Sequence, residues 1–169
     1  MFRQKRKRSG KTVEVGSVNI FHQIDSSKTS PSSEFDDVFQ SASASVVFGE
    51  SEGARFGSCV AAAGDLNDDG VDDFIVGAPL EGSSSGRRRK SSSTGAIYVF
   101  HGSRRGKIKS FSQRILPEDL DLFGIFGFGI SLSTGEDMDG NGLPDVTVGN
   151  GFDQFTYSFI ACTYTLSFL

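Results

Sequence analysis

Residues 56–79 constrain the fold of this chain more than any other stretch, because they have the pattern of a strand, a polar loop and a second strand. Small and β-branched residues fill positions 58–63, and an apolar, β-rich run follows at 74–76. Between them lie nine residues, 65–73, that consist mainly of Asp, Asn and Gly. The Gly-Ala-Pro sequence at 77–79 is expected to stop the second strand. The stretch therefore predicts two short strands joined by an acidic loop.

The spacing of oxygen atoms in this loop indicates a calcium site. Oxygen-bearing side chains occupy its first, third, fifth and ninth positions, and glycine occupies the sixth, where a chain that curls around a cation must turn sharply. Ca²⁺ takes about six to eight oxygen ligands. The predicted ligands of this first loop are the side chains of Asp65, Asn67, Asp69 and Asp73 and the backbone carbonyl of Val71. Asp68 and Asp72 are out of phase and are expected to face solvent.

A second copy of the loop lies at residues 137–145. A Phe-Gly pair precedes each copy, and both features shift by 72 residues, the pair from 56 to 128 and the loop from 65 to 137. The predicted ligands of the second loop are the side chains of Asp137, Asp139, Asn141 and Asp145 and the carbonyl of Leu143. An acidic turn that holds Asp, Asn and Gly only for turn chemistry is the alternative. The repetition favours a metal site.

An EF-hand is excluded by the ligand set and by the context. An EF-hand loop needs a bidentate Glu at its twelfth position and a helix on each side. The twelfth position is Val76 in the first copy and Val148 in the second, and both copies have strand-like flanks.

Together, the Phe56-Gly57 pair, the nine-residue loop and the Gly-Ala-Pro sequence resemble the FG-GAP repeat of integrin α-subunit β-propellers. The likeness extends to residues 95–103 and 112–115, which are similar to the third strand and the outer segment of such a blade. The second copy departs from the pattern with Gly-Asn-Gly at 149–151. The resemblance implies an all-β fold of FG-GAP propeller blades, and the chain is expected to form an incomplete propeller of about two blades with disordered or irregular ends. It also implies Ca²⁺ as the cofactor.

The chain divides into four expected parts. They are a basic arm at 1–11, a partial preceding blade with a Ser-rich insertion at 12–54, a complete FG-GAP blade at 55–122 and a partial blade with an irregular tail at 123–169. Residues 16–22 echo 95–101 and predict the third strand of the preceding blade, whereas the tail lacks that pattern. In an up-and-down blade the first and third turns share one edge of the sheet. The calcium loops are first turns, and the basic loop at 81–94 is a second turn at the opposite edge.

Charge is local in this sequence. The formal net charge is −4, and nine of the 21 acidic residues lie in 65–73 and 136–145, which argues for cation binding at the loops and against a uniformly charged surface. The basic residues in 3–11 resemble a nuclear-import or nucleic-acid patch, but no nucleic-acid fold follows, and a solvated arm is the preferred interpretation. We expect no nucleic-acid partner. The two cysteines exclude a disulfide scaffold.

The predicted function is a calcium-stabilised propeller segment of an integrin-α-like cell-adhesion receptor, a protein-binding scaffold without catalysis. The resemblance implies an integrin β-like subunit and extracellular protein ligands as partners of the full-length parent, at the extracellular face of the cell membrane. No run of about 18 apolar residues predicts a transmembrane segment here, and the basic start lacks the apolar segment of a signal peptide, so a longer parent is expected.

The alternative function is an FG-GAP module of a secreted or surface enzyme, similar to the phospholipase D that cleaves glycosyl-phosphatidylinositol anchors. No catalytic constellation accompanies His22 or His101, which end predicted strands without a nearby Ser or Cys in a triad-like setting. Such an enzyme would need catalytic residues outside this chain.

Overall fold

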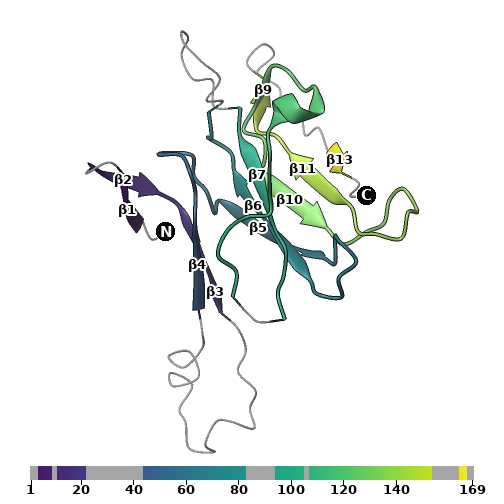
Figure 1. Ribbon diagram of the computed structural model, residues 1–169. Coiled ribbons are helices and arrows are strands. Elements are labelled where there is room, and N and C mark those ends of the chain that lie inside the picture. The colour runs from purple at the N-terminus through teal and green to yellow at the C-terminus, as the bar shows by residue number, and fades with distance from the viewer. Residues whose placement is uncertain are drawn as a thin grey trace, which may run out of the picture.

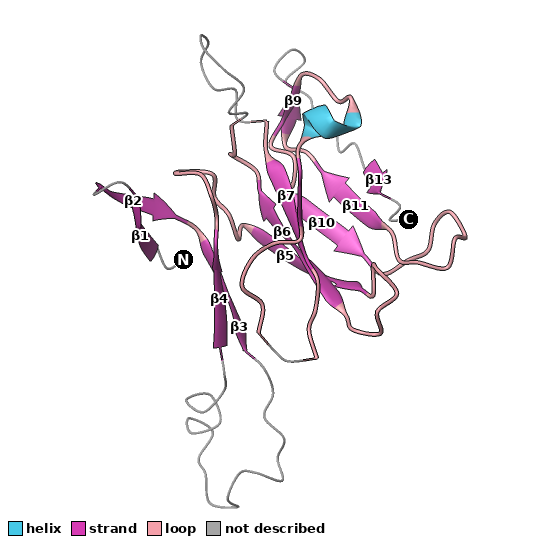
Figure 2. Ribbon diagram, in the orientation of Figure 1, coloured by secondary structure: helices cyan, strands magenta, loops and turns pink. Residues whose placement is uncertain are grey.

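The structure is a computed structural model that describes residues 4–8, 11–21, 44–82, 94–104, 107–153 and 164–166. The described part of the chain is all-β, as the sequence predicted, and its single helical element is the 3₁₀ turn η2 (Pro117–Leu120) (Figures 1 and 2). Within these ranges no helix is long and apolar enough to cross a membrane.

A four-stranded antiparallel sheet forms the centre of the molecule. It consists of β5 (Cys59–Gly64), β6 (Asp73–Ala78), β7 (Ala96–Phe100) and β8 (Gln113–Ile115), which pair in chain order. The sequence placed the end of the second strand at Gly77, but β6 continues in register through Ala78, which pairs with Ala96. Gly and Ala are small enough for the strand to continue between two neighbouring sheets, where both residues are buried.

Two further sheets lie on opposite sides of the central sheet. On one side, β3 (Ser17–Phe21) pairs with β4 (Ala44–Phe48), as expected for the third and outer strands of a preceding blade. On the other side lie β10 (Ser131–Thr134), β11 (Val146–Gly149) and β13 (Tyr164–Leu166) in the order β10-β11-β13. The short strands β9 (Ile125–Phe126) and β12 (Phe152–Asp153) pair with each other.

Strands also form at both ends of the described chain. The tail lacks the pattern of residues 95–101, but it supplies a third strand, because β13 pairs with β11 in the register of β7 with β6, so that Tyr164 lies opposite Val148 as Tyr98 lies opposite Val76. At the basic arm, β1 (Gln4–Arg8) pairs with β2 (Lys11–Val15), whose β-branched residues favour a strand.

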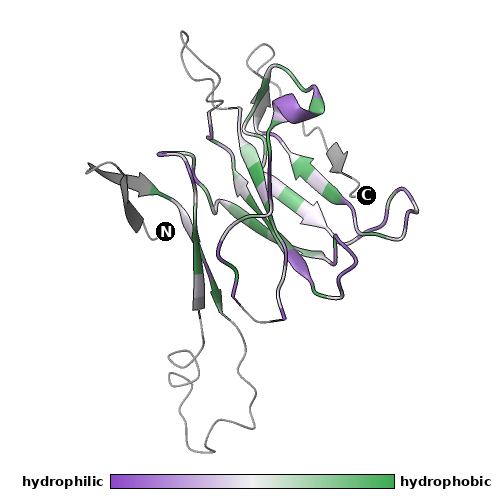
Figure 3. Ribbon diagram, viewed as in Figure 1, coloured by the Kyte–Doolittle hydropathy of each residue, from purple (hydrophilic) through white to green (hydrophobic). Residues whose placement is uncertain are grey.

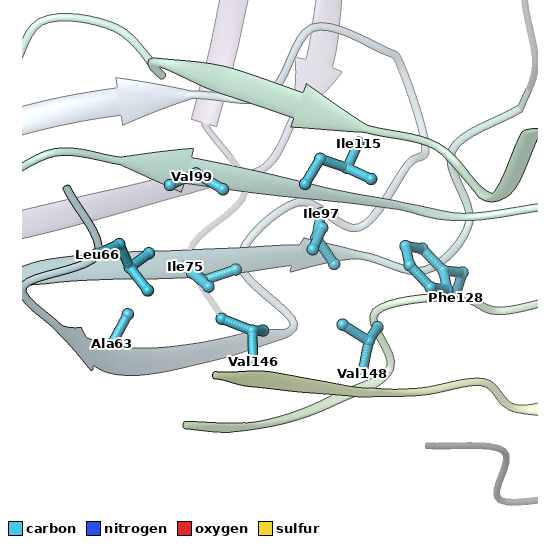
Figure 4. Close-up of a cluster of buried hydrophobic side chains, with 9 residues drawn as sticks. All are labelled: Ala63, Leu66, Ile75, Ile97, Val99, Ile115, Phe128, Val146 and Val148. Atoms are coloured by element: carbon cyan, nitrogen blue, oxygen red, sulfur yellow. The ribbon is translucent and has the colours of Figure 1, made fainter. Parts of the chain in front are cut away.

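The central strands contain many hydrophobic residues (Figure 3), and apolar side chains cover both faces of the sheet. The cluster between this sheet and β10–β11 is shown in Figure 4 and consists of Ala63, Leu66, Ile75, Ile97, Val99, Ile115, Phe128, Val146 and Val148. The cluster on the β3–β4 side consists of Val47, Ala54, Phe56, Val76, Ala78, Ala96, Tyr98 and Phe100. Each large aliphatic or aromatic side chain buried in this way contributes about 1.5–3 kcal/mol. The successive apolar positions of β6 and β7 are explained by this double coverage.

The Phe-Gly pairs join each sheet to the one before it. Phe56 and Phe128 are 3% and 0% exposed, and their carbonyl oxygens lie where a side chain on Gly16 or Gly95 of the preceding sheet would have to be. Gly57 then takes the left-handed φ of +86°, and its N–H donates to the Gly77 carbonyl at 3.0 Å. The second copy repeats this contact between Gly129 and Gly149 at 3.0 Å. The repeat therefore needs glycine at these positions, where the backbones of two neighbouring sheets are in contact and leave no space for a Cβ.

A substitution at Gly77 tests this packing. An added Cβ would overlap the Gly129 carbonyl of the neighbouring sheet, although Gly77 has an ordinary negative φ. We expect Gly77→Ala to lower the unfolding free energy by about 1–3 kcal/mol in urea denaturation, the usual cost of overpacking.

The matched control is Gly151→Ala, where the nearest atom to an added Cβ is Ile130 Cδ1 at 3.5 Å. Both variants restrict the unfolded chain equally, so their difference reports the contact alone. Equal stability of the two variants would contradict the steric explanation.

Candidate metal centre

The two acidic loops connect the first and second strands of their sheets. The first loop, residues 65–73, joins β5 to β6, and the second, residues 137–145, lies between β10 and β11. Most of their side chains are exposed, including the out-of-phase Asp68 and Asp72, as predicted. The last residue of each loop is instead buried: Asp73 and Asp145 are both only 2% exposed.

The second loop brings three of its predicted ligands together. Carboxylate oxygens of Asp137, Asp139 and Asp145 all lie within 4.8 Å of one another. The predicted ligand Asn141 lies beside them, since its Nδ2 donates to Asp139 Oδ2 at 3.3 Å. Leu143 is held in the loop through its N–H, which donates to Asn141 Oδ1 at 2.7 Å. This cluster consists of the oxygen donors that a hard divalent cation requires.

Backbone N–H groups orient the first carboxylate in both loops in the same way. Asp65 accepts from the N–H of Asp69 at 3.0 Å and of Gly70 at 2.6 Å, one bond to each oxygen. Asp137 accepts from Asn141 at 3.1 Å and from Gly142 at 2.8 Å, the same positions 72 residues later. The first carboxylate is therefore fixed at the centre of each loop.

The remaining side-chain bonds repeat as well. The Asn67 and Asp139 Oδ1 atoms accept from the residue two positions on, at 3.2 and 3.0 Å. Asp69 Oδ1 accepts from Val71 N–H at 2.9 Å, as Asn141 accepts from Leu143. The buried carboxylates also match: Asp73 Oδ2 accepts from Leu66 N–H at 3.1 Å and Asp145 Oδ2 from Met138 N–H at 2.6 Å. The two loops therefore share one hydrogen-bond scaffold.

This scaffold keeps the first carboxylate charged. Desolvation raises the pKa of Asp65, but the backbone N–H groups of Gly70, Asp69, Asn67 and Asp68 outweigh it and hold the pKa below its ordinary value of 3.8. The carboxylate is therefore ionised at neutral pH and available to a cation.

Residues 56–100 match the family model described as FG-GAP repeat. These residues form an FG-GAP repeat. The chain is 46% identical over 103 residues to integrin alpha pat-2 of Caenorhabditis elegans, which is 61% of this chain and 8% of that protein. Integrin alpha-E of Mus musculus is 41% identical over 97 residues, 57% of this chain and 8% of that protein.

A third relative, integrin alpha-PS5 of Drosophila melanogaster, is 40% identical over 113 residues, 66% of this chain and 10% of that protein. The chain is thus similar to integrin α chains over about 60% of its residues, and it spans a tenth or less of the length of these relatives.

The two acidic loops differ in the order of their predicted ligands. Each ligand set combines three acidic side chains with one Asn, but the Asn is Asn67, at the third position, in the first loop and Asn141, at the fifth, in the second. The acidic trio of the second loop uses positions one, three and nine. Because the first loop has an amide at position three, that all-carboxylate grouping cannot form there.

The interactions of two residues, Glu81 and His101, were not predicted from the sequence. Glu81 was placed in a polar loop, but it is only 1% exposed and accepts from Tyr98 Oη at 2.5 Å and from Arg114 Nη1 at 3.1 Å. The contact of His101 with the first loop was also not predicted: its Nδ1 lies 3.1 Å from Nδ2 of the predicted ligand Asn67. The basic tip at 87–90 lies outside the described residues.

The position of Glu81 explains why it was missed. It follows the Gly-Ala-Pro sequence directly, where polar residues usually begin a loop, and its partners are 17 and 33 residues away in the chain. The one sequence signal for a buried acid was the pair of Tyr98 in the third strand and Arg114 in the outer segment, which lie opposite each other in the sheet. Such long-range pairing is not visible in a local pattern.

Removing the Tyr98 hydroxyl tests this buried network. Tyr98→Phe leaves the Glu81 carboxylate with one partner fewer. We expect the unfolding free energy near neutral pH to fall by about 1–3 kcal/mol, the cost of an unsatisfied buried acceptor.

The effect has a defined pH dependence. Burial, followed by the hydrogen bond and the charge of Glu81, raises the pKa of Tyr98 well above its ordinary value of 10.0. The contribution of the Tyr98 hydroxyl to the unfolding free energy is therefore complete below pH 10. Above pH 10 it declines by up to about 1.4 kcal/mol per pH unit, because the unfolded state loses a proton that the folded state keeps. The gap between the wild-type chain and Tyr98→Phe should narrow above pH 10. A constant gap to pH 11 would contradict the network.

Proposed function

We propose that this chain is a calcium-stabilised β-propeller segment of an integrin-α-like cell-adhesion receptor and acts as a protein-binding scaffold that performs no catalysis. In this proposal residues 55–122 are a complete blade, and 12–54 and 123–169 are parts of its two neighbours. The observation that carries it is the pair of loops 72 residues apart, at 65–73 and 137–145, whose predicted ligands share one hydrogen-bond scaffold.

The donor set fits calcium better than other common metals. Asp65, Asn67, Asp69, the Val71 carbonyl and Asp73 would hold one ion, and Asp137, Asp139, Asn141, the Leu143 carbonyl and Asp145 would hold the other. All are oxygen donors, and neither loop contains the His or Cys that zinc prefers. An exposed nine-residue loop suits the flexible, high coordination number of Ca²⁺ better than the strict octahedron of Mg²⁺. A bound cation would offset the three negative charges among the ligands of each loop.

The partners follow from the relatives. Because these are named as integrin α chains, we propose an integrin β-like subunit and extracellular protein ligands as partners, and a location at the extracellular face of the cell membrane. The alternative enzyme module gains no support from the His101 ring, whose described contact is Asn67 and not a Ser or Cys nucleophile.

Calorimetry on the 169-residue chain tests the two calcium sites. The wild-type chain is expected to bind two Ca²⁺ ions with Kd values of about 10⁻⁴–10⁻³ M, the range of extracellular modules. Asp69→Ala and Asn141→Ala each remove the ligand at position five and should each abolish one site. The control is Asp72→Ala, an exposed acid of the first loop that is not a predicted ligand. Undiminished binding in the double variant Asp69→Ala/Asn141→Ala would overturn the assignment.

Chelation tests whether the metal is structural. A few-fold excess of Ca²⁺ over Kd stabilises the folded state by about 1 kcal/mol per site. For a chain of this size two sites correspond to a rise of about 4–8 °C in Tm, which a chelator should reverse. The double variant should show no chelator effect. Calcium-dependent hydrolysis of a phosphoester by this chain would instead favour the enzyme.

A further inference from the structure

The connection between β7 and β8 is described over residues 101–104 and 107–112, and its first part, 101–104, lies directly against the first acidic loop, residues 65–73. The N–H of Gly102 donates to Oδ1 of the predicted ligand Asp73 at 2.7 Å. A side chain at position 102 would overlap the carbonyl of Asp72 and the side chain of Val71. This glycine is therefore explained by the closeness of the loop, since its φ is not in the left-handed region.

Two side chains of the same connection reach other ligand positions of the loop. His101 Nδ1 lies 3.1 Å from Asn67 Nδ2, and Arg104 Nη2 donates to the Asp69 carbonyl at 3.4 Å. The connection thus contacts residues at the third, fifth and ninth positions, all of them predicted to hold the ion. Any ordering of the loop by a cation would be transmitted to residues 101–104.

The far part of the connection reaches the preceding sheet. The N–H of Ile108 donates to Ser45 Oγ on β4 at 3.2 Å. Ile108 and Phe111 also pack against the apolar cluster that contains Val47 of β4. Figure 1 shows the connection and the first loop at the same end of the central sheet.

We propose that the described residues of this connection, 101–104 and 107–112, couple the first cation site to the junction between the central sheet and β3–β4, as a strap, so that calcium at residues 65–73 tightens that junction. This inference rests on the proposed calcium function. Binding orders the loop, the ordered loop fixes residues 101–104, and the connection then holds β4. By linkage, docking of β3–β4 must strengthen calcium binding at the first loop by the same factor.

The second loop provides an internal control. It connects β10 and β11, which lie on the side of the central sheet opposite to β3–β4. Calcium at residues 137–145 is therefore expected to leave the β3–β4 junction unchanged.

Hydrogen exchange of the 169-residue chain, followed by mass spectrometry of peptides covering β4, tests the coupling. Saturating CaCl₂ should slow exchange of β4 in the wild-type chain by at least about fivefold, the lower end of typical site-to-site coupling. The slowing should persist in Asn141→Ala and disappear in Asp69→Ala. Equal slowing in Asp69→Ala, or none in a wild-type chain that binds calcium at the first loop, would overturn the proposal.

The strap itself is tested by uncoupling variants. Gly102→Ala should bind calcium more weakly at the first loop and lose the slowing at β4. If this variant fails to fold, His101→Ala/Arg104→Ala removes the side-chain contacts and leaves the backbone intact, and it should reduce the slowing at least twofold. Lys107→Ala, at an exposed position of the same connection, is the matched control and should retain the full effect.

Calorimetry of the same samples separates the two hypotheses. If the wild-type chain binds no calcium, both the proposed function and the proposed coupling are wrong. Two bound ions with unchanged exchange at β4 would remove the coupling alone.

Discussion

Burial of the central sheet on both faces is the constraint on which the rest of the structure depends. Ile75 and Val76 are adjacent in β6 and both 0% exposed, so one must pack against β10–β11 and the other against β3–β4. Such a sheet cannot be stable in water without two neighbours, because either exposed face would forfeit the burial of several large apolar side chains. Close stacking in turn brings backbones into contact. Glycine is required where they meet, as at Gly16 against Phe56 and at Gly95 against Phe128.

The two acidic loops are positioned by the same sheets. Each begins where a first strand ends and finishes with a buried Asp at the start of a second strand, so the sheet fixes both ends of the loop. Burying Asp73 is tolerable because its two oxygens accept backbone N–H groups from Leu66 and Gly102. Backbone N–H groups thus hold the buried end of each loop in place. In the proposed calcium function, the cation would add charge compensation and complete the ordering of the loop.

Much of the fold could be predicted from the local spacing of residues. The rest depends on contacts between residues that are distant in the chain. The loop, its ligand set and the strands on each side could be predicted because ligand positions and strand alternation are fixed within about twenty residues. Glu81 could not, since its burial depends on Arg114 from the outer strand. Nor could β13, whose residues 164–166 show no clear repeat pattern and are set by pairing with β11. The contact of His101 with Asn67 depends on the path of a whole connection.

The first loop touches both of its neighbours, and this distinguishes it from the second. Leu66, at its second position, is 2% exposed and lies in the cluster with Val146 of the following sheet, whereas Met138 at the same position of the second loop is 63% exposed. On the other side, the connection from His101 to Phe111 leads from the loop to the preceding sheet. A cation at this loop, as proposed, would therefore lie between two junctions of three consecutive sheets. Two loops with one hydrogen-bond scaffold and the same ligand charge thus differ through their surroundings, because only the first has described residues packed on both sides of it.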